Sequence, residues 1–453
     1  MKENTQAALL LGTEPIAKLL KKYSVPAIIA MTASSLYNMV DSIFIGQGVG
    51  AMAISGLALT FPFMNLSAAF GAMVGVGAST LVSMSLGRKD YETARNVLGN
   101  VVLLNIVLGI LFSIVSLVFL KDILMFFGGS PETIGYAADY MRIILYGNVI
   151  THLYLGLNGI LRAAGHPKKA MFATIITVLV NVVLDPIFIF VFGWGIQGVA
   201  IATILAQCVP LVWLIRTLNN KNELIYFTPK SFKLQFAIVK DILSIGLAPF
   251  LLNSALCLIV VLINKGLQTQ GGDLAVGAYG IVNRVNYLFV MIVLGLTQGM
   301  QPIVGFNFGA RQFLRVKEAL KITIKLATGV TVFGFLCAQI FPKFMASLFT
   351  SDTDLITLTV YGLRCVFITF PVVGFQIVTS NFFQSIGQVK KSIFLSLSRQ
   401  VLFLVPLLLI LPNFYGVTGV WISMPISDII ATFFSATLLI YFFKSIAKLE
   451  KNK

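Results

Sequence analysis

The sequence predicts an all-α integral membrane protein with twelve transmembrane helices in two pseudo-symmetric six-helix bundles. Hydrophobic residues make up 57% of the 453 positions and charged residues only 11%, so most of the chain cannot form an ordinary water-facing surface. Apolar runs of the roughly 20 residues that a membrane helix needs recur along almost the whole chain. A shift of about 222 residues aligns the second half of the sequence with the first.

Polar and charged clusters separate the apolar runs and define twelve expected spans. The first span is expected to act as an uncleaved insertion signal, because the earlier apolar stretch Ala7 to Leu11 is too short for the core of a secretory signal. Each later span is an apolar run of sufficient length between two polar clusters. In chain order, the spans cover residues 16–45, 52–84, 93–120, 133–157, 168–192, 196–217, 237–264, 272–303, 317–342, 355–381, 392–411 and 416–443.

The distribution of basic residues predicts the orientation of these spans. Most of the 33 Lys and Arg fall on alternate loops and on the two tails, which the positive-inside rule assigns to the cytoplasm. We therefore expect a multi-pass protein of a prokaryotic plasma (inner) membrane, with both termini cytoplasmic. The net charge of +16 then reflects orientation and contact with membrane lipids, and no nucleic-acid partner is expected, because the basic residues form no patch on a soluble domain. Basic residues on the expected inner loops include Arg88, Lys89, Lys168, Lys169, Arg311, Lys390 and Lys391, whereas Lys121, Lys265 and Lys343 fall outside.

Matching landmarks in the two halves predict the domain organisation. The segment GHPKK, which contains Lys168 and Lys169, falls on GQVKK, which contains Lys390 and Lys391. Six spans return the chain to the inner side, so the halves form a parallel repeat that encloses a central pathway. We expect an N-terminal lobe over residues 1–218, a cytoplasmic linker over residues 219–236 and a C-terminal lobe over residues 237–453.

Three acidic residues lie deep within expected spans: Asp41, Asp185 and Asp428. A charged side chain at bilayer depth costs at least about 2.5 kcal/mol on insertion scales, so such residues are retained for a reason. Tyr37 precedes Asp41 by four residues, and Asn181 precedes Asp185 by four, which places each pair on one helix face.

Asp41 and Asp185 belong to the same half at similar depth, so they could share one pocket, and neighbouring carboxyl groups can load and release a proton. The alternative is a hydrogen-bond network that only holds helices together. Pro186 follows Asp185 directly and removes a backbone donor, and Pro26 could similarly loosen the first span, so both prolines are candidate conformational hinges.

Four arginines also lie within expected spans. Arg142 and Arg364 occupy matching places near outer helix ends, where their side chains are expected to reach the interface. Arg284 and Arg399, together with Asp428, are candidates for a cavity in the C-terminal lobe.

The sequence carries no signature of a metal centre, a cofactor or an enzyme. His152 and His166 have no partner at metal-ligand spacing, and the motifs HExxH, GxSxG and DDxxD are absent. Sodium is the one metal ion expected to have a possible site, at Asp41 and Asp185. The cysteines stand singly in or beside apolar segments, as small hydrophobic residues do; they are Cys208, Cys257, Cys337 and Cys365.

Several segments, in order, resemble the multidrug and toxic compound extrusion (MATE) family over essentially the whole chain. They are SLYNMVDSIFIG at 35–46, SLGR at 85–88, GILRAAGHPKKA at 159–170, NVVLDPIFIF at 181–190 and GMQPIVGFNFGA at 299–310. The pattern is most similar to the branch that contains DinF-like prokaryotic pumps. The resemblance implies a V-shaped arrangement of two six-helix bundles that alternates between inward and outward openings.

The resemblance also implies which residues bind the coupling ion. In this branch, the N-terminal lobe carries a proton-responsive network, and the bending place of the first helix matches Pro26. The NorM-like branch also uses acidic residues of the C-terminal lobe for sodium, but here Asn264 repeats Asp41, which argues against such a site. The matching positions of the N-terminal network are Asp41, Asp185, Tyr37, Asn158, Asn181 and Thr203.

The function expected from these arguments is secondary active multidrug efflux by alternating access. The chain would export amphipathic organic cations, such as drugs and dyes, in exchange for protons or sodium, as a monomer and without a cofactor. The alternative is a flippase of the same superfamily that moves a lipid-linked saccharide. Such flippases tend to have extra spans and a strongly cationic cavity, so twelve spans argue against this alternative, whereas Arg284 and Arg399 keep it open.

Overall fold

The computed structural model describes residues 9–49, 51–127 and 133–451, and within them every regular element is a helix. The first half begins with the short 3-10 helix η1 (Leu9–Gly12), and a π-helical segment, η2 (Ile187–Val191), follows its seventh α-helix. The α-helices of this half are α2 (Ile16–Gly48), α3 (Ala51–Gly87), α4 (Tyr91–Val118), α5 (Leu120–Phe126), α6 (Ile134–Tyr146), α7 (Asn148–Ala163), α8 (Pro167–Pro186) and α9 (Gly195–Leu218).

The second half begins after a connecting segment that contains the 3-10 helix η3 (Pro229–Phe232). A second π-helical segment, η4 (Ser398–Leu404), joins α15 to α16. The α-helices are α10 (Phe236–Gly309), α11 (Phe313–Ile340), α12 (Pro342–Ser347), α13 (Thr353–Phe367), α14 (Phe370–Ser385), α15 (Val389–Leu397), α16 (Val405–Ile410) and α17 (Pro412–Lys451).

The helices have the lengths and compositions of membrane spans. Among the described residues, nine helices are long and apolar enough to cross a membrane, and two bent helix pairs bring the number to eleven. The remaining expected span, residues 16–45, coincides with α2, whose 33 residues correspond to about 50 Å of helix. The structure therefore agrees with the predicted all-α membrane fold.

The fourth and tenth spans differ from the prediction of uninterrupted helices over 133–157 and 355–381. Each is a pair of helices, with a bend of 56° between α6 and α7 and of 53° between α13 and α14. Gly147 lies at the first break, and Pro371, which lacks a backbone donor, lies just after the second. Both spans continue further than expected, to Ala163 and Ser385.

The expected loop between the seventh and eighth spans is also helical. The seventh span continues as part of α10 to Gly272, where a left-handed φ of 67° turns the chain into the eighth span. Glycine adopts this conformation without steric cost. Within this polar stretch, the hydroxyl of Thr269 donates to the carbonyl of Lys265 at 2.8 Å, one turn earlier in the same helix.

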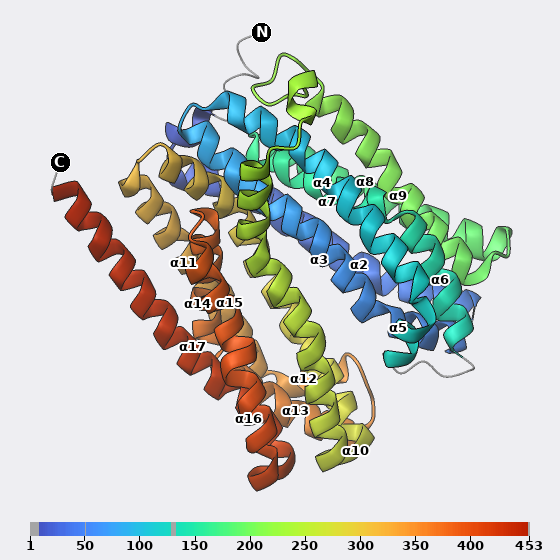
Figure 1. The fold of residues 1–453 in the computed structure, drawn as a ribbon. Coiled ribbons are helices and arrows are strands. Elements are labelled where there is room, and N and C mark those ends of the chain that lie inside the picture. The colour runs from blue at the N-terminus through green and yellow to red at the C-terminus, as the bar shows by residue number, and fades with distance from the viewer. Residues whose placement is uncertain (1–8, 50, 128–132, 452–453) are drawn as a thin grey trace.

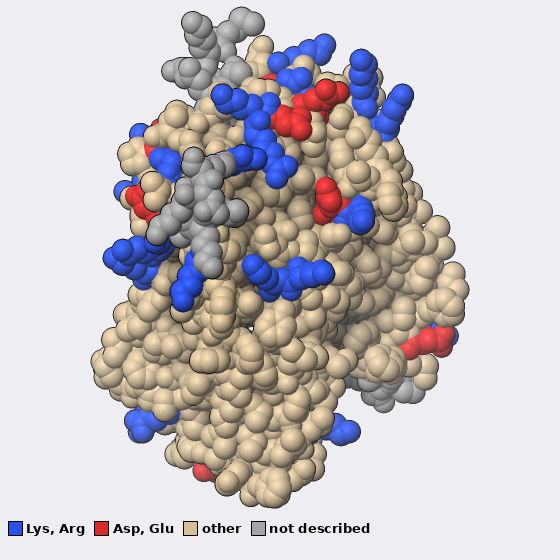
Figure 2. All heavy atoms as spheres, turned by 60° about the vertical axis from the view of Figure 1, so that its left-hand side comes forward, with Lys and Arg blue, Asp and Glu red and all other residues tan. Residues whose placement is uncertain are grey.

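The two halves form two bundles that lie closest at one end of the molecule and diverge towards the other (Figure 1). The start of α2 and the end of α17 both lie at the end where the bundles meet (Figure 1). Lys and Arg gather over this same end, and the rest of the visible face has few charged side chains (Figure 2). We call it the basic end.

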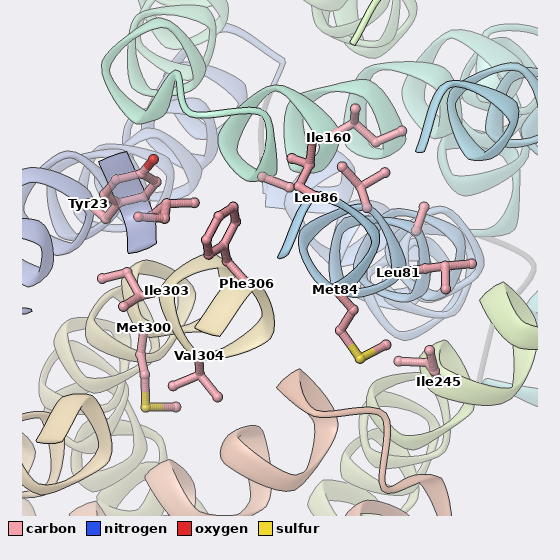
Figure 3. Close-up of a cluster of buried hydrophobic side chains, with 14 of the residues drawn as sticks. Tyr23, Leu81, Met84, Leu86, Ile160, Ile245, Met300, Ile303, Val304 and Phe306 are labelled. Carbon is pink, nitrogen blue, oxygen red and sulfur yellow. The ribbon is translucent and has the colours of Figure 1, made fainter. Parts of the chain in front are cut away.

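A shared hydrophobic core joins the bundles near the basic end. Figure 3 shows side chains of α2, α3 and α7 beside side chains of α10. Glycines bring the backbones together around this core: a Cβ on Gly77 of α3 would overlap the carbonyl oxygen of Ile242, and a Cβ on Gly246 of α10 would overlap that of Met73. At six glycines an added Cβ would overlap backbone atoms of the other half, and we call these six the glycine seam; they are Gly77, Gly87, Gly246, Gly295, Gly299 and Gly309.

The segment between α9 and α10 packs against the first bundle. Asn100 of α4 donates from Nδ2 to the carbonyl of Lys233 at 3.0 Å and accepts from the backbone N–H of Gln235 at 2.9 Å. Arg95, five residues earlier on α4, donates to the carbonyl of Leu224 at 3.0 Å. The connection is therefore attached to α4 along most of its length.

Candidate functional site

Two buried carboxyl groups lie together inside the first bundle. Asp41 on α2 is 7% exposed, and Asp185 near the end of α8 is 0% exposed. Their carboxyl groups lie within hydrogen-bonding reach of one another. Asn181, one turn before Asp185 on α8, donates from Nδ2 to Asp185 Oδ1 at 3.2 Å. The helical spacing of four residues thus places Asn181 against Asp185, and the packing of α2 on α8 places Asp41 beside Asp185.

Hydroxyl groups from three helices surround the carboxyl pair. The hydroxyl of Tyr37 on α2 lies 3.4 Å from Thr203 Oγ1 on α9. Tyr140 on α6, which is 2% exposed, also lies within hydrogen-bonding reach of Thr203 and is close enough to both aspartates to interact with them electrostatically. Tyr140 is not among the residues predicted from the sequence. Its helical spacing with Ala137 and Ile144 indicates a buried face, but this signal does not say which polar group the face meets.

Three oxygens of this site lack a partner among the described residues: Asp41 Oδ1, Asp185 Oδ2 and Asn181 Oδ1. Buried polar atoms in native proteins are almost always hydrogen-bonded, so unsatisfied ones call for an explanation. Oxygens of this kind accept a proton-bearing group or coordinate a hard cation. A hydrogen bond between two carboxyl groups itself requires a proton on one of them, because an ionised carboxylate has only acceptors.

The described residues include no group of three or more His, Cys, Asp or Glu side chains that could hold a metal ion. The oxygen set at Asp41 and Asp185 therefore consists of two carboxyl groups with amide and hydroxyl neighbours. Such a set is suited to a proton, and it also offers the oxygen ligands that an alkali cation prefers.

Asn158 does not lie with the carboxyl pair. Its Nδ2 donates to the carbonyl of Ala170 at 3.0 Å, near the start of α8. The 15 residues between Ala170 and Asp185 correspond to about 22 Å along the helix. Asn158 instead lines a cavity of about 180 Å³ nearer the basic end. The resemblance implies a place for Asn158 in the network by its matching position, and the structure separates it by depth.

The two prolines lie in different local structures. The ring of Pro26 lies within α2 and lines the same cavity as Asn158, and α2 continues through this position as one helix. Pro186 is the last residue of α8, directly before the π-helical segment η2. A π-helical turn is wider than an α-helical one and often accompanies a functional site, and here it begins two residues after Asp185.

The candidate residues of the C-terminal lobe do not form one group. Arg399 Nε lies 2.6 Å from Asp428 Oδ1, and the hydroxyl of Thr369 donates to Asp428 Oδ2 at 3.1 Å. Both oxygens of this buried carboxylate therefore have partners. Arg284 lies on an exposed part of α10 and takes part in none of the ion pairs among the described residues. The pairing neutralises Arg399, which removes one of the two cations expected for a flippase cavity.

Known proteins match this chain over nearly its full length. The family model MatE matches it twice, over residues 26–187 and residues 247–410. Multidrug export protein MepA of Staphylococcus haemolyticus (strain JCSC1435) is 26% identical over 436 residues, which cover 96% of each chain. The outward-facing conformation of a multidrug resistance MATE family transporter of the MOP superfamily has a TM-score of 0.91 at 27% identity, with 100% of this chain and 99% of that chain covered. A crystal structure of MATE in the bent conformation has a TM-score of 0.92 at 28% identity, with 99% of each chain covered.

The two matches of the family model begin about 222 residues apart, which is the shift of the internal repeat. Each half of the chain thus corresponds to one copy of the same unit, and the predicted fold of two six-helix bundles is confirmed. The family model matches well over half of the sequence, and the structural likeness extends over the entire chain. The chain belongs to the MATE family of multi-pass membrane transporters.

Proposed function

We propose that this protein exports amphipathic organic cations from the cytoplasm of a prokaryote in exchange for protons, by alternating access. The names of its relatives support drug export, since they include a multidrug export protein and a multidrug resistance transporter. Aromatic and methionine side chains are abundant, with 37 Phe and 14 Met, and such side chains bind flat organic cations in apolar cavities. The transporter acts as a monomer in the inner membrane and needs no cofactor.

The observation that carries this proposal is the contact between the carboxyl groups of Asp41 and Asp185. Two carboxyl groups in contact can share one proton, and the unsatisfied oxygens of this pair can accept another. Asn181 orients Asp185 through its hydrogen bond, and the hydroxyls of Tyr37 and Thr203 contact each other beside the pair. One charge that crosses 100 mV is worth about 2.3 kcal/mol, so proton entry supplies useful driving force. Sodium at the same oxygens is the alternative coupling ion.

The charge asymmetry supports the orientation, because the basic end corresponds to the cytoplasm under the positive-inside rule. The bundles then diverge towards the outside, in an outward-open state. Residues 1–218 and 237–453 act as the two moving lobes, and residues 219–236 connect them on the cytoplasmic side. Protons reach Asp41 and Asp185 from outside and change the packing of α2 around Pro26 and of α8 near Pro186. The drug leaves because it and the protons favour different states.

The test is dye efflux by wild-type protein in liposomes, with the pH gradient and the sodium gradient imposed separately. Asp41→Asn and Asp185→Asn should each lower pH-driven efflux by at least about tenfold, because an amide cannot exchange a proton. Asp139→Asn is the matched control, since Asp139 is 44% exposed and pairs with Arg142. Unchanged efflux in both buried variants would exclude the coupling role. Efflux that follows only the sodium gradient would replace the proton by sodium.

A further inference from the structure

A small cavity nearer the basic end has the features of an anion site. It has a volume of about 180 Å³ and lies between α2, α7 and α8, with one side formed by Gln298 of α10. Its lining includes the hydroxyl-bearing residues Tyr23, Ser34 and Thr174 and the nitrogen-bearing residues Asn158 and Arg162. None of the described residues that line it is acidic.

The guanidinium of Arg162 has no carboxylate partner among the described residues. It donates from Nη1 to Gln298 Oε1, across the boundary between the two bundles. The ion pairs in the described part of the chain involve Lys18, Arg142, His166, Lys169 and Arg399, and none includes Arg162. A guanidinium has five N–H donors, so a single neutral acceptor leaves most of them unused. The carbonyls at the end of α7 can offset only part of the positive charge.

A second donor in the same cavity is unsatisfied. The side chain of Tyr23 is 1% exposed, and its hydroxyl has no hydrogen-bond partner among the described residues. In Figure 3, this hydroxyl points away from Met300 and Ile303 of the hydrophobic core. The acidic residue near Tyr23 is Glu14, which pairs with Lys18 at 3.4 Å and does not line the cavity. A buried hydroxyl without a partner is rare, and an acceptor bound in the cavity would satisfy it.

The volume of the cavity limits the size of the ligand that it can hold. Pockets for drug-sized molecules have volumes of about 300–1,000 Å³, and water takes up about 30 Å³ per molecule in the liquid. The cavity of about 180 Å³ therefore excludes a drug in this state but holds a small anion with a few waters. Arginine is well suited to such ligands, because its planar fork binds carboxylate and phosphate oxygens.

We propose that the cavity between Arg162, Tyr23 and Gln298 binds a small anion such as chloride, acetate or inorganic phosphate. Gln298 belongs to the second bundle and the other lining residues to the first, so the site is complete only while the bundles meet at the basic end. A bound anion therefore stabilises this closed arrangement over one in which the bundles part there. The site is separate from the carboxyl pair and does not require proton coupling.

The test is thermal unfolding of the purified full-length protein in detergent, in sodium chloride, acetate or phosphate against sodium gluconate at equal pH and ionic strength. The melting temperature should rise with the concentration of at least one small anion relative to gluconate. Arg162→Gln should abolish this rise, because it removes the charge but keeps a polar side chain. Arg142→Gln is the control, since Arg142 is 53% exposed, and it should retain the full rise.

Tyr23→Phe provides a second, milder variant in case Arg162→Gln does not fold. It removes one donor and should shift the half-saturating anion concentration upward several-fold. Crystals soaked in sodium bromide should show anomalous density beside Arg162. The proposal is overturned if the wild-type melting temperature is the same in all four salts, or if neither variant changes the response to the anion.

Discussion

Gly246→Ala should shift the transporter away from the state in which the bundles meet at the basic end. Gly246 lies in the glycine seam, where an added Cβ would overlap the carbonyl oxygen of Met73 on α3. The obstacle is backbone, which cannot rotate away, so α10 and α3 would have to part by roughly 1–2 Å to restore a normal contact of about 3.5 Å. No such clash is expected once the bundles have separated there.

The size of the shift follows from the cost of overpacking. An extra methyl group in a tightly packed interface costs about 1–3 kcal/mol. If this cost applies only while the bundles meet at the basic end, the ratio of closed to open molecules decreases by about 5- to 150-fold. Alanine is otherwise the better helix former by about 1 kcal/mol, and that gain is common to both states.

The assay is a distance distribution between spin labels at two exposed positions of the basic end, Lys168 and Glu318, in a protein whose native cysteines are replaced. Gly246→Ala should move the main population to longer distances. Gly280→Ala is the matched control, because a Cβ added to Gly280 on the same helix α10 would meet no other part of the protein within 4 Å, and it should leave the distribution unchanged. If Gly246→Ala also leaves the distribution unchanged, the seam does not control the closure of this end.

Three further predictions concern other contacts. Removal of the buried charge partner in Arg399→Met should lower the stability of the protein by about 3–5 kcal/mol, and the double variant Arg399→Met with Asp428→Leu should recover most of it, as thermal unfolding would reveal. Burial lowers the pKa of His166, whose Nε2 lies 2.9 Å from the carboxylate oxygen Oε2 of Glu223. Stability should therefore fall as the pH drops below about 6.5, the ordinary histidine value, and His166→Gln should flatten this dependence between about pH 7.5 and 5.5 in thermal unfolding. Tyr140→Phe should slow pH-driven dye efflux several-fold with an unchanged melting temperature, and equal loss of both would mean that Tyr140 is only a packing residue.

The fold could be predicted because membrane spans depend on composition over windows of about 20 residues. The same averaging hides the bends at Gly147 and Thr369, since a break of one or two residues leaves the mean hydropathy unchanged. The helical extension of the seventh span to Gly272 was missed for a related reason. The polar stretch after residue 264 ends the apolar run in the sequence, but in the structure these residues remain helical and extend α10 beyond its apolar part.

Only those residues of the candidate site whose burial is energetically costly could be predicted from the sequence. Asp41 and Asp185 were found because a carboxyl group at that depth is expensive. Tyr140 was missed because tyrosine in a membrane helix is common and its contact with Thr203 depends on how α6 packs against α9. The pairing of Arg399 with Asp428 was likewise beyond the sequence argument, because the two residues meet only through tertiary packing.

The attachment of the connecting segment to α4 limits how the two halves can move. Asn100 binds the backbone of Lys233 and Gln235 immediately before α10 begins at Phe236. The chain thus passes from one lobe to the other at the first turn of α10. The residues just before this turn are held on α4 and belong structurally to the N-terminal lobe. In the proposed alternating access, the second lobe would therefore rotate about a nearly stationary point at the start of α10, because the segment before it is already held on α4.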